Sequence, residues 1–413
     1  MTYLFTVGKN PLPVALAVLY LHNRQSKRAG ENLYRLLCSQ ESVNPEGENI
    51  KTFLGGRGIE CEEAAIPNGL ARFDANNGKK IHSYIKTVLT SLPKPFHFHY
   101  SGGTAAMAAH GLLAVKTADP TAETSYIGLN NQLVSDAGHE SEDLRRGVQL
   151  TFEELRLLHG YFRCEERCDG TPIPELTERL APLAVAGWQQ LRKGKAMNGH
   201  AEARIRPATE ASYPVYTDNR ELAEALDGAF GKALWTAEAD GLLWKATLTT
   251  NSSEFWDTHH YFAKSGWFEF KSLAALREAI GQQRKWSPDI VFAQHCGRSK
   301  RVEAESGERR TFEIDIAAVF GYQLILISCT STRKDKTKEK AFEALHRARQ
   351  LGGAGARAIV VSDEEDCVVK QYQESLDLDI GLTKDVRSKP LEVWGKGKLS
   401  HLSLSFTDYI TRL

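Results

Sequence analysis

Residues 311–320 are rich in β-branched and apolar residues, with polar and apolar positions alternating over residues 312–316, and a second apolar run follows over residues 323–329. Both runs have the length and the β-branched content of strands. Gly321 and Tyr322, which lie between the two runs, supply a turn. The pattern therefore predicts a β-hairpin in the C-terminal part of the chain.

A polar loop over residues 330–337 separates this hairpin from a helix. Apolar residues recur at helical spacing from Glu339 to Leu351, and Gly352–Gly353 would end the helix. The apolar run 356–362 is the next predicted strand, and strand, helix and strand together have the length of a βαβ unit. Near the C-terminus, apolar residues alternate with serine over residues 402–406, which predicts a short terminal strand.

The N-terminal part shows another order of elements. Residues 2–7 form an apolar run, the loop 8–13 is rich in Gly, Pro and Asn, and a helix starts at Val14. Residues 95–100 form a second strand, and Ser101–Thr104 lead into a second helix. A strand, a tight loop and a helix are typical of the start of doubly wound α/β folds. Ligands in such folds gather at the carboxyl ends of the strands, so both loops are candidate binding sites.

Glycine before a helix lets backbone N–H groups approach a phosphate, and the N-terminus of the helix favours an anion. Gly102 and Gly103 precede the second helix in this way. The alternative is that the glycines only make turns and that Ser101 or Thr104 only caps the helix. Two loops of this kind in one parallel α/β unit favour the binding site.

The chain of 413 residues is long enough for two or three domains. We expect an N-terminal α/β domain over residues 1–145 and a second α/β domain over residues 252–413. Residues 146–251 carry no motif that we can assign, and we expect them to connect the two domains. Cys164 and Cys168 in this connector lack the second pair of ligands that zinc sites use, so we expect free thiols.

Composition limits the possible partners. Lys+Arg and Asp+Glu are each 52, so the chain has no overall basic charge and nucleic acid would have to bind to a local patch. Residues 333–349 offer such a patch, with seven Lys/Arg against three Asp/Glu. No apolar run has the length of a membrane span, the N-terminus lacks the layout of a signal peptide, and seven scattered cysteines fit a reducing cytosol. We therefore expect a cytoplasmic protein without membrane partners.

Candidate chemistry lies on the predicted hairpin and helix. Glu313 and Asp315 are two residues apart on a strand, so their side chains share a face. Along the following helix, polar residues recur every three or four positions and form one stripe: Lys336, Lys340, Glu343, Arg347 and Gln350. Carboxylates suit a hard divalent cation, and basic groups suit a phosphodiester beside it. The alternative is a solvated sheet edge and an ordinary exposed helix face.

These residues also carry a resemblance to a known family. The segments E-I-D, I-S-C-T and K-x-K-x-F-E-x-x-x-R-A-R-Q-L-G-G resemble the nuclease domain of CRISPR ancillary effectors, which join an N-terminal CARF sensor domain to a C-terminal PD-(D/E)xK-type nuclease domain. In that restriction-endonuclease-like fold an acidic residue on one strand, matched by Asp315, is followed by E-x-K on the next. Ser328-Cys329-Thr330 stands there instead. Either the acid and the lysine have moved to the helix as Glu343 and Lys340, which we favour, or the domain is catalytically weakened.

Two further segments fit the resemblance. Gly266 to Glu269 resembles the first helix of the nuclease fold, in which an acidic residue often completes the metal site, although an exposed helix-start glutamate is the simpler alternative. Ser101 to Met107 resembles the G-G-T-x-x-M loop that CARF domains present to cyclic oligoadenylates, and the loop after the first strand is the other ligand loop of that family. The implied ligand contacts are Gly8, Lys9, Asn10, Ser101, Gly102, Gly103 and Thr104.

The resemblance implies a function for both ends of the chain. A Rossmann-like CARF domain would bind a cyclic oligoadenylate, with cyclic tetra-adenylate as the expected ring, across the two-fold axis of a homodimer. A nuclease of type III CRISPR antiviral defence would then cleave RNA or DNA. Its Mg²⁺ or Mn²⁺ would be held by Asp315, by Glu343 or Glu313, and by Glu269, while Lys340 orients water or neutralises charge.

Two alternatives stay open. The first is a ligand-gated regulator with an inactive nuclease-like domain, because Ser328 and Thr330 replace the expected acid and lysine. The second is an ordinary nuclease whose first domain serves only for dimerisation or nucleotide sensing.

Overall fold

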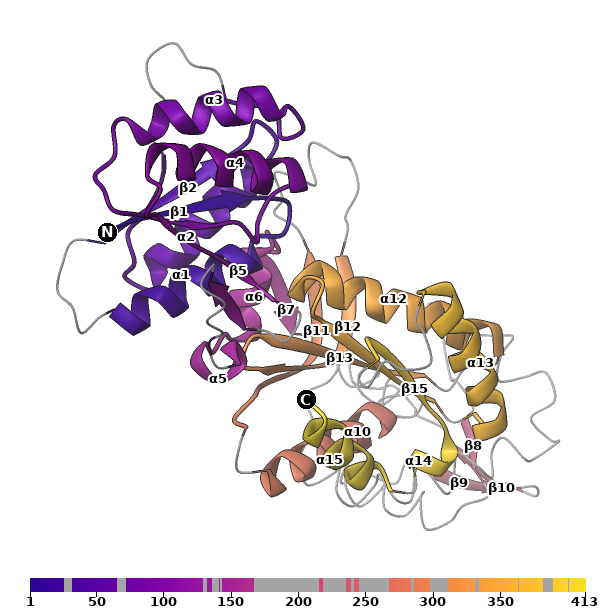
Figure 1. Ribbon diagram of the computed structural model, residues 1–413. Helices are drawn as coiled ribbons and strands as arrows, with labels where there is room; N and C mark the ends of the chain where they lie inside the picture. Colours follow the sequence, from indigo (N-terminus) through magenta and orange to yellow (C-terminus); the bar gives the residue numbers. More distant parts are fainter. Residues whose placement is uncertain are drawn as a thin grey trace, which may run out of the picture.

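Figure 1 shows the computed structural model of the chain. It describes residues 1–25, 32–64, 72–128, 132–135, 141, 143–166, 215–217, 235–238, 241–244, 267–283, 286–297, 311–330, 334–362, 364–381, 389–399 and 401–413. The described strands form a six-stranded sheet near each end of the chain and a small antiparallel sheet between them in sequence. The small sheet has the order β8-β10-β9 and consists of β8 (Val215–Thr217), β9 (Trp235–Glu238) and β10 (Gly241–Trp244). Within the described part, no helix is both long and apolar enough to cross a membrane.

The N-terminal sheet has the strand order β3-β2-β1-β4-β5-β6, and its first five strands run parallel. The strands are β1 (Thr2–Val7), β2 (Leu33–Cys38), β3 (Cys61–Glu63), β4 (Phe96–His99), β5 (Glu123–Ile127) and β6 (Leu133–Ser135), the last antiparallel to β5. β1 is buried along its whole length, as expected for a strand that is covered on both faces. The strand order reverses between β1 and β4, which makes their carboxyl ends the topological switch point of the sheet.

Helices cover both faces of this sheet (Figure 1). They are α1 (Leu12–Gln25), a π-helical turn (Val43–Gly47) continued by α2 (Glu48–Gly56), α3 (Gly78–Leu89) and α4 (Ala105–Ala118). Leu4 and Phe98 pack in a cluster with α3 and α4, whereas Tyr3 and Phe5 pack in a cluster with α1 and α2. This arrangement confirms the predicted doubly wound α/β unit.

The C-terminal sheet has the order β15-β14-β13-β12-β11-β7. Its strands are β7 (Arg163–Glu166), β11 (Asp289–Gly297), β12 (Thr311–Phe320), β13 (Gln323–Thr330), β14 (Arg357–Ser362) and β15 (Leu391–Trp394). β12 and β13 form the predicted hairpin, and β13, β14 and β15 run parallel. The hairpin turns at Gly321, whose φ of 65° lies in the left-handed region. The predicted hairpin and βαβ unit are thus confirmed.

Helices also lie on both faces of the C-terminal sheet. They are α10 (Trp267–Gln282), α12 (Lys334–Gly352), α13 (Asp366–Asp379), α14 (Lys396–Leu399) and α15 (Leu402–Thr411). Side chains of α12 and α13 join the same apolar cluster as Leu324 and Val360, while α10 and α15 pack against Ile325 and Ile359 on the other face. α12 begins at Lys334, so the predicted polar loop is shorter than residues 330–337.

The strand predicted over residues 402–406 is wrong, because these residues lie in α15. Leu402, Phe406 and Tyr409 are buried on one side of this helix, whereas Leu404 is 61% exposed. The helical repeat that continues to Tyr409 therefore outweighs the short alternation that resembles a strand.

Two short helices join the sheets: α5 (Leu144–Gly147) and α6 (Phe152–Leu158). The Arg145 guanidinium donates a 2.8 Å hydrogen bond to Gln323, and the Leu150 N–H donates a 2.7 Å bond to the carbonyl of Gly321. One apolar cluster runs through these helices from β1 to β13. β7, from the predicted connector, pairs with β11, while the domain boundaries at 145 and 252 stay predictions. The Cys164 side chain and Cys168, predicted as free thiols, lie outside the described part.

Candidate functional site

The two predicted ligand loops meet at the switch point of the N-terminal sheet. Gly8 follows β1, and Ser101–Gly103 follow β4, the neighbouring strand. A Cβ on Gly8 would lie 2.5 Å from the nitrogen of Gly103, and a Cβ on Gly102 would lie 1.9 Å from the carbonyl oxygen of Thr6. The two backbones therefore touch, and only glycine allows this approach.

Polar side chains of the second loop hold the loop itself. The Ser101 hydroxyl accepts a hydrogen bond from the Ile127 N–H at 2.5 Å. The Thr104 hydroxyl accepts one from the Met107 N–H at 3.2 Å and donates one to the carbonyl of Ala75 at 2.6 Å, so Thr104 caps α4. The N-terminus of α4 and the exposed Lys9 of the first loop are the groups best suited to an anionic ligand.

Asn10, also predicted as a ligand contact, faces the C-terminal part of the chain. Its Oδ1 accepts a 3.1 Å hydrogen bond from the Leu12 N–H and lies 3.4 Å from Nε2 of His159, which follows α6. A Cβ on Gly353, at the end of α12, would lie 2.7 Å from Nδ2 of Asn10. The first loop is therefore in direct contact with the end of α12.

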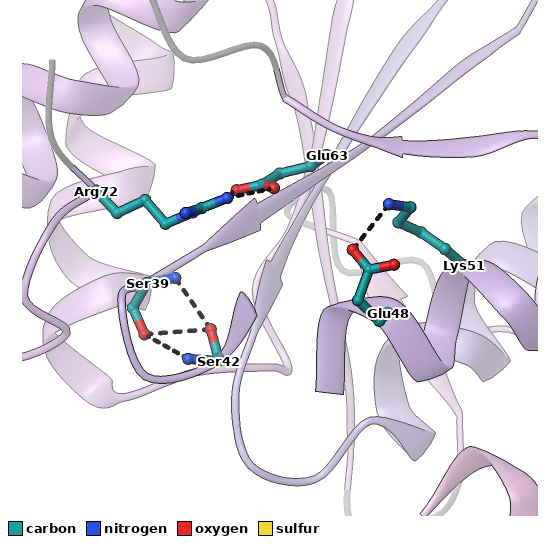
Figure 2. Close-up of polar contacts among 6 residues, drawn as sticks. All are labelled: Ser39, Ser42, Glu48, Lys51, Glu63 and Arg72. Atoms are coloured by element: carbon teal, nitrogen blue, oxygen red, sulfur yellow. Dashed lines mark hydrogen bonds and ion pairs between the residues drawn. The ribbon is translucent and has the colours of Figure 1, made fainter. Parts of the chain in front are cut away.

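Figure 2 shows polar contacts at the carboxyl ends of β2 and β3. In the sheet, β2 is the neighbour of β1, the strand that leads into the first ligand loop. The hydroxyl of Ser42 accepts hydrogen bonds from the N–H of Ser39 at 2.9 Å and from its hydroxyl at 3.1 Å, which closes the turn after β2. Glu63 at the end of β3 accepts two 3.0 Å bonds from the guanidinium of Arg72. The charges shown on this side of the switch point are thus paired within the chain.

A second candidate site lies in the C-terminal sheet, where a cavity of about 230 Å³ opens between β12, β13 and α12. Its polar lining consists of Glu313, Asp315, Ser328, Lys340, Glu343 and Arg347. The structure therefore brings the four residues predicted for catalysis, from a strand and from a helix, into one pocket.

Asp315 lies where the hairpin opens. The pairing of β12 with β13 extends from Phe320, next to the turn, to Ile316, and Asp315 is the first residue of β12 beyond the paired part. One carboxylate oxygen of Asp315 accepts hydrogen bonds from the Cys329 N–H at 2.7 Å and from the Ser328 hydroxyl at 3.2 Å. Burial raises the pKa of the Cys329 thiol well above its usual value, and the charges of Asp315 and Glu269 raise it further. Ser328, which stands where an acid is expected, thus contacts the neighbouring acid.

The helix side of the pocket carries charges in a row along α12. The Lys340 ammonium lies 3.3 Å from the Glu343 carboxylate, and both side chains are about half exposed. Arg347 lies one turn further, with its guanidinium carbon 4.5 Å from the ring centroid of Phe312. The polar stripe predicted that Arg347 shares a helix face with Lys340 and Glu343, but its contact with Phe312 requires the tertiary structure. The side chain of Lys336, also predicted in the stripe, lies outside the described part.

Two of the three predicted metal ligands line the pocket, and the third acts on the neighbouring Cys329. Asp315 and Glu343 line the pocket, while Glu269 is buried on α10, which covers the opposite face of the sheet. Among the described residues, no group of three or more His, Cys, Asp or Glu could hold a metal ion. The oxygen donors of the pocket still fit Mg²⁺ or Mn²⁺, because Mg²⁺ commonly takes one or two carboxylates and completes its shell with water and substrate phosphate.

The chain was compared with known proteins. No protein-family profile matches it, and no curated protein matches its sequence. The solved structures that are similar over nearly the whole chain include the following two. Protein VC1899 from Vibrio cholerae is 15% identical with a TM-score of 0.65, covering 100% of this chain and 98% of its own. Can2 from Sulfobacillus thermosulfidooxidans, solved in complex with cyclic tetra-adenylate, is 13% identical with a TM-score of 0.64, covering 99% of each chain.

Identities this low describe a shared fold and leave activity to be argued from the residues. The predicted combination of a Rossmann-like N-terminal sheet and a second α/β sheet is confirmed by the strand orders. The chain therefore has, over nearly its whole length, the fold of VC1899 and of Can2.

Proposed function

We propose that this chain is an ancillary nuclease of type III CRISPR antiviral defence, with a CARF sensor at residues 1–145 and a PD-(D/E)xK-like nuclease domain at residues 252–413. The observation that carries the proposal is the C-terminal pocket. It combines the carboxylates of Glu313, Asp315 and Glu343 with the cations of Lys340 and Arg347. Carboxylates and cations together suit a phosphodiester bound beside a divalent ion.

The proposed activator is a cyclic oligoadenylate, cyclic tetra-adenylate in particular. Two features support it: the fold shared with Can2, which was solved with that ligand, and the meeting of the two loops at the switch point. The N-terminus of α4 and Lys9 would contact phosphate groups of the ring. A ring that lies on a two-fold axis would bring two chains together, so we propose a cytoplasmic homodimer.

The pocket residues divide the chemical work. Asp315, kept in place by Cys329 and Ser328, would be the first ligand of Mg²⁺ or Mn²⁺, with Glu343 or Glu313 as the second. When bound, the ion would supply an activated water and neutralise charge on the phosphate. Lys340 would orient the attacking water or neutralise charge that develops during cleavage of RNA or DNA.

A ligand-gated regulator without nuclease activity is the second candidate. It is favoured by the positions of Ser328 and Thr330, which stand where an acid and a lysine are expected, and by the ion pair of Lys340 with Glu343. In this case the N-terminal domain would bind the ring and the C-terminal pocket would bind nucleic acid without cutting it.

A cleavage assay separates these candidates. Labelled RNA and plasmid DNA are incubated with the protein and Mn²⁺, with and without cyclic tetra-adenylate. Cleavage that requires the ring supports the nuclease and identifies its substrate. Ring binding without cleavage, with rings of any size, supports the regulator. Cleavage that does not depend on the ring supports an ordinary nuclease, whose first domain only dimerises or senses nucleotides.

A further inference from the structure

We propose that Arg347 binds a phosphate group of the nucleic-acid backbone in the C-terminal pocket. Arg347 lies one helical turn after Glu343 on α12, and its side chain lines the same cavity as Asp315. The proposal rests on the proposed function and names a substrate contact within it.

Aromatic side chains fix the position of the Arg347 guanidinium. Its central carbon lies 4.5 Å from the ring centroid of Phe312, a distance at which a guanidinium is attracted to the face of the ring. The Phe312 side chain is itself buried, and Tyr161 packs against it with ring centroids 5.5 Å apart and planes at 80°. Because its support is rigid, Arg347 loses little freedom when a ligand binds.

The hydrogen-bonding groups of Arg347 are only partly used. Nη1 donates a 3.0 Å bond to Gln350, and Nη2 lies 3.9 Å from Glu343, beyond hydrogen-bond distance. Nε is buried and has no hydrogen-bond partner in the described part of the chain. A buried donor without a partner is unfavourable, and an incoming phosphate oxygen would supply the missing acceptor. The planar edge formed by Nε and Nη2 matches the geometry of a phosphate.

Lys340, the other cation of the pocket, suits this task less well. Its side chain is 52% exposed, so its position is less well defined, and at 3.3 Å its charge lies closer to the Glu343 carboxylate than that of Arg347 does at 3.9 Å. The Arg347 side chain is 29% exposed. Arg347 is therefore the better placed of the two to hold a phosphate, which leaves Lys340 to act on the water or on charge that develops during cleavage.

Binding can be measured without cleavage. A fluorescein-labelled RNA oligonucleotide, and the DNA of the same sequence, are titrated by anisotropy with the full-length protein in EDTA at saturating cyclic tetra-adenylate, at several salt concentrations. The variants are Arg347→Met, which keeps the apolar stem on Phe312; Arg347→Lys, which keeps the charge; and Phe312→Leu, which keeps the arginine. Arg277→Met, an exposed arginine of α10 on the opposite face of the sheet, is the matched control. Thermal unfolding of each variant checks that it is folded.

We expect Arg347→Met to weaken binding by about tenfold or more, and to reduce the slope of log Kd against log salt by about one, since one phosphate contact is lost. Arg347→Lys should bind more tightly than Arg347→Met but less tightly than the wild type, and its slope of log Kd against log salt should equal that of the wild type. Phe312→Leu should weaken binding several-fold with an unchanged slope, because the charge remains while its support is lost. Arg277→Met should stay within about twofold of the wild type.

Two results would overturn the proposal, and they differ from each other. If the wild type binds nucleic acid and Arg347→Met binds as well as Arg277→Met, then Arg347 is not the phosphate contact, although the proposed function stands. If the folded wild type binds neither RNA nor DNA, with or without the ring, the proposed function fails and the phosphate contact fails with it.

Discussion

At the scale of single residues, the proposed chemistry depends most on Asp315. Its carboxylate holds the end of β13 through the Cys329 N–H and also faces the pocket. A substitution at this position therefore changes both structure and charge, and two variants are needed to separate the effects.

Asp315→Asn removes the charge but keeps a carbonyl oxygen that can accept the bond from Cys329. We expect it to be as stable as the wild type within about 1 kcal/mol and to lose ring-dependent cleavage by about a hundredfold or more. Asp315→Ala should lose the same activity and about 1–3 kcal/mol of stability, because the Cys329 N–H is left without its acceptor. Urea unfolding and the cleavage assay measure the two effects. Unchanged cleavage by Asp315→Asn would remove Asp315 from the active site.

Two buried histidines give a prediction about pH. Burial lowers the pKa of His99 to about 3 and that of His159 to about 4, so both rings are neutral in the folded chain at pH 7. Below the usual histidine pKa of about 6.5, the unfolded chain takes up protons that the folded chain does not. The contribution of these two histidines to the free energy of unfolding is therefore complete above about pH 6.5. It is lost as the pH falls toward 4, by up to about 1.4 kcal/mol per pH unit for each histidine.

Urea unfolding at a series of pH values between 7 and 4.5 measures this loss. His159→Asn, which removes one of the two rings, should make the dependence of unfolding free energy on pH less steep. Asp119 and Glu154 contribute in the same direction, but their pKa values are lowered from those of ordinary carboxyls, so their loss falls at lower pH, below about 4.5. A wild type whose stability is constant from pH 7 to 5 would contradict the burial of both rings.

At the scale of elements, α15 shows that a short alternating pattern can belong to a helix. The sequence alternates over residues 402–406, and a strand would place Leu402, Leu404 and Phe406 on one face. In the helix, Phe406 packs against Trp394 with ring centroids 4.8 Å apart, while Leu404 is 61% exposed. The two residues should therefore differ strongly in their contribution to stability.

Phe406→Ala should destabilise the chain by about 3–5 kcal/mol, since it removes a fully buried aromatic side chain from the cluster of α10 and α15. Leu404→Ser should change stability by less than about 0.5 kcal/mol, as most exposed substitutions do. Urea unfolding of both variants measures the difference. Equal destabilisation by the two substitutions would favour the strand over the helix.

The elements that could be predicted from the sequence are those in which a long run of apolar or periodic apolar positions ends at a glycine. The hairpin of β12 and β13 has an apolar run on each side of Gly321, and α12 ends at a glycine pair. The pocket was predictable only in part, because Glu313 and Asp315 share a strand but meet Lys340 and Glu343 through tertiary packing.

Other contacts of the site leave no trace in a local pattern. The stacking of Arg347 on Phe312 joins residues that are 35 positions apart in the chain. The side chain of Asn10 lies against His159 and Gly353, which are still further away in the sequence. Sequence spacing describes neighbours on one element and is silent about which elements face each other.

At the scale of the whole molecule, the first ligand loop and the helix of the pocket are in contact. Asn10 lies in the loop that follows β1, and Gly353 directly follows α12, which carries Lys340, Glu343 and Arg347. His159 lies beside the same asparagine: its Nδ1–H donates to the carbonyl of Leu155 at 2.9 Å, and its Nε2, which carries no proton in the neutral ring, lies 3.4 Å from Asn10. A cyclic oligoadenylate that moves the first loop would therefore also move groups that touch the end of α12. This contact gives a physical basis for a ligand-induced shift between two arrangements of the chain.

Gly353→Ala tests this contact. Gly353 has a φ of 69°, and an added Cβ would lie 2.7 Å from Asn10, so alanine should cost about 1–2 kcal/mol and displace the asparagine. We expect cyclic tetra-adenylate to bind within about threefold of the wild-type affinity, because Lys9 and the N-terminus of α4 are unchanged, whereas the ring-dependent rise in cleavage should fall by about tenfold, the usual range of an allosteric coupling. Gly355→Ala is the matched control, since no atom lies within 4 Å of its added Cβ.

A double-mutant cycle, in which Asn10→Ala and Gly353→Ala are tested alone and together, measures whether this contact carries the coupling. If the contact carries the coupling, Asn10→Ala makes room for the new methyl group, so the second substitution should have a smaller effect in the double variant than alone. Strictly additive losses, or a Gly353→Ala protein that the ring activates as strongly as the Gly355→Ala control, would show that the signal reaches the pocket elsewhere. Another described route is the junction of α5 with β13, where Arg145 binds Gln323 and the carbonyl of Gly321 accepts from Leu150.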